Sequence, residues 1–157
     1  MFVKLALILL LLVAQAPAGR QADSRVVQSQ NKENVSVIEK VKKEVTKNPN
    51  SPDAQYQLGL AYLKAGLDQK AEMAFRKALS INHNYIDALI IIAQIELNKK
   101  NIDSAKKMIL KAKEIAPNNV RVYNVLGGIS ISEGNLNMAE ENFSKAVKID
   151  PALVDVH

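Results

Sequence analysis

The stretch PDAQYQLGLAYLKAGLDQKAEMAFRKALSINHNY, residues 52–85, decides the fold, because its pattern recurs twice more at a constant step. The copies occupy residues 86–119 and 120–153. Seven columns stay in phase: Leu58, Ile92 and Leu126; Gly59, Ala93 and Gly127; Ala71, Ala105 and Ala139; Phe75, Ile109 and Phe143; Ala78, Ala112 and Ala146; Ile81, Ile115 and Ile149; His83, Pro117 and Pro151. A fixed period of this length indicates supersecondary units that stack on one another to bury a continuous core.

Each unit carries two apolar faces with helical spacing. Positions are counted within each unit from its first residue, which is 52, 86 or 120. Unit positions 4, 7, 8 and 11 share one helical face, and positions 20, 24 and 27 share another. Small residues at 8 and 20 allow two antiparallel helices to approach closely, and a large residue at 24 fills the space beside them. Proline at 32 cannot continue a helix, so it ends the hairpin. The spacing predicts helices over 52–65, 68–81, 86–98, 102–115, 120–133 and 136–149.

These units resemble tetratricopeptide repeats over the whole range 52–153. The resemblance is carried by six of the seven columns, all except that of Ile81, Ile115 and Ile149, and by Tyr62 at the aromatic position 11 of unit one. Departures from the family pattern are Gln55, Leu89 and Tyr123 in place of Trp at position 4, and Glu96 and Ser130 in place of the aromatic at 11. The resemblance implies an all-α fold, a right-handed α-solenoid of three helical hairpins.

The flanks of the repeats are irregular. Residues 19–33 are polar without a sustained period, so we expect a linker. The apolar stripe Val37, Ile38, Val41 and Val45 predicts a capping half-repeat helix over 34–49. Residues 154–157 match the start of a further repeat. Two interpretations of that tail stay open, a frayed end or the beginning of a longer array.

Residues 1–18 predict an export signal. Lys4 precedes an apolar run from Leu5 to Ala14, and Ala16-Pro17-Ala18 offers a cleavage site before Gly19. The run is shorter than the roughly 20 residues of a membrane-spanning helix and fits a signal-peptide core. An uncleaved anchor in a bacterial inner membrane is the alternative. We therefore expect an exported protein of the bacterial envelope, in the periplasm or anchored to the membrane.

The composition argues against catalysis and metal binding. The chain has no Cys and only two His, which excludes thiolate chemistry and disulfides. Neither a His pair nor a phosphate-binding glycine loop is present. We expect no catalytic residues, no metal site and no cofactor. His83, at the slot where the other units have proline, is expected to be structural.

One stretch of unit two is strongly basic, with Lys99, Lys100, Lys106, Lys107, Lys111 and Lys113. It indicates either an outer helix face in water or a patch for an anionic partner. No aromatic residues for base stacking lie within it, so we expect no nucleic-acid binding.

The family resemblance implies a partner-binding groove on the first helices, at positions 2, 5, 9 and 12 and sometimes 6 and 13. Here the four main positions hold Asp53, Tyr56, Leu60, Leu63, Asp87, Ile90, Gln94, Leu97, Arg121, Asn124, Gly128 and Ile131. Half are apolar, which favours a helical or extended apolar segment of a partner protein. The family's carboxylate-clamp residues are absent, because Tyr56, Leu60, Ile91 and Val125 stand at their positions and only Arg121 is basic.

Together these features predict a non-catalytic protein–protein interaction scaffold of unknown partner. Two alternatives stay open. The units could stack with other copies in a self-associating structural protein, or the N-terminal apolar segment could contact the membrane in an anchored accessory subunit.

Overall fold

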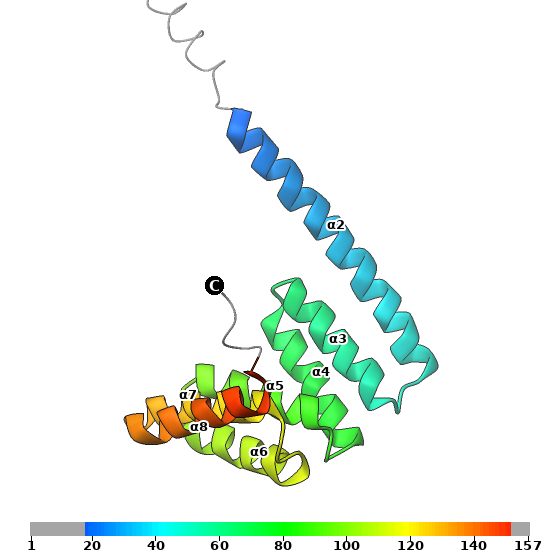
Figure 1. Cartoon of the computed structure of the whole chain (residues 1–157). Coiled ribbons are helices and arrows are strands. Elements are labelled where there is room, and N and C mark those ends of the chain that lie inside the picture. The colour runs from blue at the N-terminus through cyan, green and yellow to red at the C-terminus, as the bar shows by residue number, and fades with distance from the viewer. Residues whose placement is uncertain (1–17, 152–157) are drawn as a thin grey trace, which may run out of the picture.

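The computed structural model describes residues 18–151, with side chains from residue 30 onward. Within this range seven helices follow one another and no strand occurs. They are α2 (Ala18–Lys47), α3 (Pro52–Lys64), α4 (Asp68–Ile81), α5 (Ile86–Asn98), α6 (Ile102–Ile115), α7 (Val120–Ser132) and α8 (Leu136–Ile149). The all-α solenoid that the resemblance implies is confirmed, and α3 to α8 end within one residue of the bounds predicted from the spacing (Figure 1).

The linker predicted over 19–33 is wrong, because α2 is helical from Ala18. No proline interrupts residues 18–48, and Arg, Gln, Lys, Glu and Ala are good helix formers, so the segment needs no apolar stripe to be helical. The predicted capping helix 34–49 forms the second half of α2 and ends at Lys47. The first half of α2 extends beyond the hairpin of α3 and α4 (Figure 1).

The second half of α2 covers the first hairpin. Ile38 is buried against Leu58 and Ala61 of α3, and Val41 packs against the same cluster. An exposed ion pair between Lys64 Nζ and Glu33 Oε1, 3.4 Å long, joins the end of α3 to the middle of α2. Burial therefore anchors the capping helix, since an exposed pair of this kind contributes little.

Two predicted segments fall outside this description. The export signal over 1–18 lies outside it apart from Ala18, and the further repeat over 154–157 lies wholly outside it. Among residues 18–151, none of the helices combines the length and apolar character needed to span a bilayer.

In each hairpin, the two helices pack together through a small residue on one helix and a large residue on the other. Ala71 and Ala105 are fully buried where paired helices meet. A Cβ atom on Gly59 would lie 2.7 Å from Cζ of Phe75 and closer still to Cε1, so the ring packs directly on the α3 backbone. The packing expected from positions 8, 20 and 24 is therefore confirmed, and it sets the separation between the two helices of a unit.

The last unit is more open than the other two. Phe75 and Ile109 are fully buried, but Phe143, at the same repeat position, is 37% exposed. Within residues 30–151, nothing covers α8 in the way that α5 covers α4 and α7 covers α6. An apolar face is therefore exposed on α8.

Candidate partner-binding groove

The twelve predicted groove residues all lie on the first helices of the three units, α3, α5 and α7. They are not equally accessible. Asp53, Gln94, Asn124 and Arg121 are exposed, and Leu60, Leu63 and Leu97 are half-buried. The structure thus places all twelve residues on one row of helices, where some are exposed to a partner and others are partly or fully buried beneath them.

Tyr56 and Ile90 are buried and do not present their side chains to a partner. Tyr56 is 8% exposed, and its ring packs between those of Phe75 and Tyr85, with centroids 5.4 Å away in both cases. Ile90 is 2% exposed and belongs to the core between units two and three. Neither side chain is therefore a contact residue, because Tyr56 belongs to the core shared by units one and two and Ile90 to the core shared by units two and three.

A pocket of about 260 Å³ lies between α5 and α7. Its rim carries Gln94, Asn124 and Arg121, and Ile90 shows only its edge in the floor. Ile91 and Val125 also line it. These two stand at position 6, next to the main groove position 5, which is the signal that could have added them from sequence.

The three residues at position 2 already have partners: Asp87 and Arg121 pair across units two and three, and Asp53 bonds to Tyr85 at the end of its own unit. The Arg121 guanidinium contacts Asp87 Oδ1 at 2.7 Å, and the Tyr85 hydroxyl donates a hydrogen bond of 2.6 Å to Asp53 Oδ1. Burial, and then the bond to Asp53, raises the pKa of the Tyr85 phenol well above its usual range, so it stays a donor. Because Arg121 already faces a carboxylate, it is poorly placed to bind a free chain terminus.

The apolar part of the groove runs from α5 to α7. Leu97 packs over Gly128, where an added Cβ would lie 3.1 Å from the Leu97 Cδ2 atom. Gly128 therefore serves close packing, although glycine costs a helix about 1 kcal/mol relative to alanine. Ile131 lies 52% exposed one turn further along α7. Together they offer a partner an apolar ridge beside the amide rim of the pocket.

Gln94 Nε2 donates a 3.2 Å hydrogen bond to Asn98 Oδ1, so the groove offers a partner mainly the Gln94 amide oxygen and the Asn124 amide. Amides donate and accept hydrogen bonds but do not titrate, so they suit recognition of a peptide and not proton transfer. Among residues 30–151, no group of three or more His, Cys, Asp or Glu side chains gathers as a metal site would require.

The basic residues of unit two do not form one patch. Lys99 pairs with Glu72, and Lys106 Nζ lies 2.8 Å from Glu133 Oε1. Lys113 Nζ lies 5.8 Å from the centre of the Tyr123 ring. Lys100 occupies the turn after α5 with a left-handed backbone, φ 64°. Only Lys107 and Lys111 remain together, beside a second pocket between α4 and α6 that also includes His83.

Comparison with known proteins agrees with the repeat geometry. The family model described as tetratricopeptide repeat matches residues 52–85, 86–119 and 120–153, the same ranges as the three units. A MamA structure from Desulfovibrio magneticus RS-1, residues 41 to the end, is 25% identical with a TM-score of 0.66, covering 84% of this chain and 73% of that one.

Two further solved structures have the same architecture. Another crystal structure of MamA is 25% identical, with a TM-score of 0.63 over 85% of this chain and 83% of that chain. The pilF protein of Pseudomonas aeruginosa is 19% identical, with a TM-score of 0.64 over 79% of this chain and 61% of that chain. At that identity the pilF likeness shows the fold alone.

Proposed function

Because this chain belongs to the tetratricopeptide repeat family, we propose that it is a non-catalytic scaffold that binds a segment of a partner protein on its first helices. The segment is an amphipathic helix or an extended apolar stretch. It lies along α5 and α7, and the scaffold thereby assembles or tethers a larger complex.

The observation that carries this proposal is the pocket between α5 and α7. It combines an apolar floor with an amide rim, and Ile131 continues its apolar surface along α7. An apolar side chain from a partner gains free energy by entering such a depression, while Gln94 and Asn124 bond to the partner's backbone. Side chains that enter a central pocket usually supply most of an interface's affinity.

The place of action in this proposal is the cell envelope, and it rests on residues 1–18. A protein exported through this segment would act in the periplasm. If the segment stays attached, the chain would instead be a membrane-anchored accessory subunit. Mass spectrometry of the mature N-terminus separates the two, because a start at Gly19 removes the anchor and a retained Met1 keeps it.

Partner capture with a matched pair of variants tests the groove. In the groove variant, Asn124→Glu and Ile131→Glu place two carboxylates on exposed positions of α7. The control is Met73→Glu, which places a carboxylate on a 72% exposed apolar residue of α4, outside the groove. We expect the wild type and the control to retain one specific envelope protein that the groove variant loses, with helical content unchanged in all three. Equal capture by the three proteins would exclude the groove as the working surface.

A second candidate function is structural self-association through α8. Leu136, Met138, Phe143 and Val147 are between 36% and 70% exposed there, and exposed apolar patches mark interaction sites. Sedimentation velocity over a range of concentrations tests this. Growth in size that Phe143→Lys abolishes supports stacking of copies through α8. A monomer at every concentration excludes it.

A further inference from the structure

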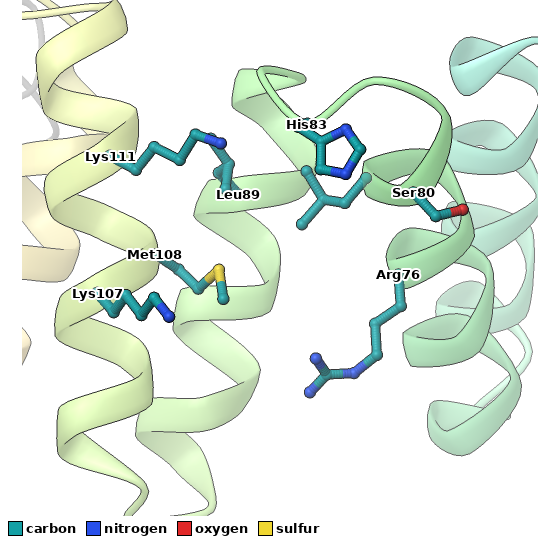
Figure 2. A pocket seen from close by; sticks show the side chains of 8 residues that line it. Arg76, Ser80, His83, Leu89, Lys107, Met108 and Lys111 are labelled. Atoms are coloured by element: carbon teal, nitrogen blue, oxygen red, sulfur yellow. The ribbon is translucent and has the colours of Figure 1, made fainter.

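A second pocket lies on the other set of helices, between α4 and α6, with a volume of about 350 Å³. Ser80 and Arg76 stand on its α4 side, Lys107 and Lys111 on its α6 side, and His83 lies above it (Figure 2). The side chains of Leu79, Leu89 and Met108 make its apolar floor. Its volume is near the lower end of ligand-binding pockets, which span roughly 300–1,000 Å³.

The next interface between units shows what is missing from this pocket. Tyr123 of unit three stands at the repeat position that Leu89 holds in unit two. It is 4% exposed, and its hydroxyl donates a 2.8 Å hydrogen bond to the Pro117 carbonyl oxygen. Its ring fills the space between units two and three. Leu89 has no ring, and the space between units one and two stays open. The shape of the pocket therefore matches an aromatic side chain.

A cation already stands beside the open space. In the filled interface, Lys145 Nζ lies 5.5 Å from the centre of the Tyr123 ring. Lys111 holds the same repeat position in unit two as Lys145 in unit three, and it lines the open pocket. An aromatic ring placed there would meet an ammonium group as Tyr123 does, and such contacts favour aromatic over aliphatic side chains.

The rim of the pocket also carries uncompensated positive charge. Arg76 is engaged by Glu72 and by Glu96, at 2.8 and 2.6 Å. Lys107 and Lys111, in contrast, make no hydrogen bond or ion pair with any side chain of residues 30–151. Two free ammonium groups on one side of an apolar pocket attract a ligand that places carboxylates next to its apolar part.

We propose that this outer pocket binds a peptide segment of a partner protein in which an aromatic side chain is flanked by Asp or Glu. The ring enters above Leu89, and the carboxylates meet Lys107 and Lys111. This site is separate from the groove on α5 and α7 and does not depend on it. It would allow one molecule to hold two partner segments on opposite sets of helices.

The test uses the full chain, labelled with ¹⁵N, and a defined probe, the peptide acetyl-Glu-Phe-Glu amide. Its matched control is acetyl-Glu-Ala-Glu amide. Leu89→Tyr fills the pocket with the residue that unit three already carries at this position, so we expect this variant to fold. Lys107→Glu combined with Lys111→Glu reverses the rim charge, and Lys148→Glu with Lys145 left intact is an exposed charge control on α8.

We expect the Phe peptide to shift the amide signals of Leu79, His83 and Leu89, and to bind at least about tenfold more tightly than the Ala peptide. Leu89→Tyr and the double Lys variant each weaken binding by about tenfold or more, and Lys148→Glu leaves it within about twofold.

Three results would overturn the proposal. The first is no binding at roughly 10 mM peptide, a level at which even a weak fragment should bind. The second is equal binding by wild type and Leu89→Tyr, or shifts centred on Gln94 and Asn124, which would place the peptide elsewhere. The third is binding to phosphatidylglycerol vesicles, undiminished in Leu89→Tyr, without peptide binding, which would assign the two lysines to a lipid surface.

Discussion

Replacing Gly59 with alanine tests the packing of the repeat most directly. The added methyl group would lie 2.6 Å from Cδ1 and 2.7 Å from Cζ of Phe75, well inside ordinary contact. The ring is fully buried and cannot move out into water. Gly127, at the same repeat position, faces Phe143 at 2.5 Å, but that ring is 37% exposed. The same substitution thus meets a fixed ring in unit one and a movable ring in unit three.

The expected magnitudes follow from this difference. Overpacking of a filled core costs about 1–3 kcal/mol, and a ring displaced by roughly an ångström in a closed site belongs at the upper end. Alanine returns about 1 kcal/mol through its helix propensity. Gly59→Ala should therefore lower the free energy of unfolding by about 2 kcal/mol. For Gly127→Ala the two contributions nearly cancel, and the change should stay within about 0.5 kcal/mol.

Unit two suggests a second substitution that should offset the destabilisation caused by Gly59→Ala. It carries Ala93 opposite Ile109, and both side chains are fully buried. Phe75→Ile in the Gly59→Ala background reproduces that pair, so the double variant should be more stable than the sum of the single changes predicts. We expect a coupling energy of about 1–2 kcal/mol.

Urea unfolding, followed by circular dichroism at the helical band, measures all four proteins of this cycle and Gly127→Ala. The urea midpoints are compared between variants whose unfolding free energy has the same slope against urea concentration. A changed slope would signal loss of cooperativity between units. Equal losses in Gly59→Ala and Gly127→Ala would refute the role of ring burial. A coupling energy of zero would refute direct contact between positions 8 and 24.

Three further changes have defined outcomes. Arg76→Met leaves the buried Glu96 carboxylate without its cation and should cost about 2–3 kcal/mol in urea unfolding, a loss that Glu96→Gln in the same chain should reduce. The raised pKa of the Tyr85 phenol means that its contribution to stability is complete below about pH 10 and is lost as the pH rises above that value. Tyr85→Phe cannot ionise and no longer bonds to Asp53. The free energy of unfolding of this variant should therefore fall less than that of the wild type between roughly pH 8 and pH 11. Lys100→Gly should raise stability by about 1 kcal/mol, because the two other units have glycine at this left-handed position, and an unchanged urea midpoint would contradict that explanation.

The residues that depart from the repeat pattern are those whose contacts the sequence did not predict. Glu96 stands in place of an aromatic residue, and spacing alone gave no account of it. In the structure its carboxylate is buried, accepts a hydrogen bond from Asn101 at 2.9 Å and pairs with Arg76 of the preceding unit. A partner on a helix of another unit is visible only when the units are stacked. The repeat pattern correctly indicated a buried side chain at this position. That a carboxylate can be buried there depends on Arg76 of the neighbouring unit.

The candidate groove was partly predictable for the same reason. Repeat positions correctly placed all twelve residues on the first helices. They did not reveal that Tyr56 and Ile90 turn into the interfaces between units, or that Arg121 pairs with Asp87. The long helix α2 was missed for a different reason. Its first half has no apolar period, and its helical state follows from the absence of breakers and from propensity.

By itself, the sequence determined the hairpins, because helix ends and the small-against-large contacts within a unit depend on residues of that same unit, which repeat in phase. The tertiary structure alone decided which surfaces remain open. The pocket above Leu89, its closed counterpart around Tyr123 and the exposed ring of Phe143 arise where one unit meets the next, or meets none. Within a unit the spacing dictates the contacts. Between units the volumes and charges of particular side chains dictate the contacts, and these differ between the interface of units one and two and that of units two and three.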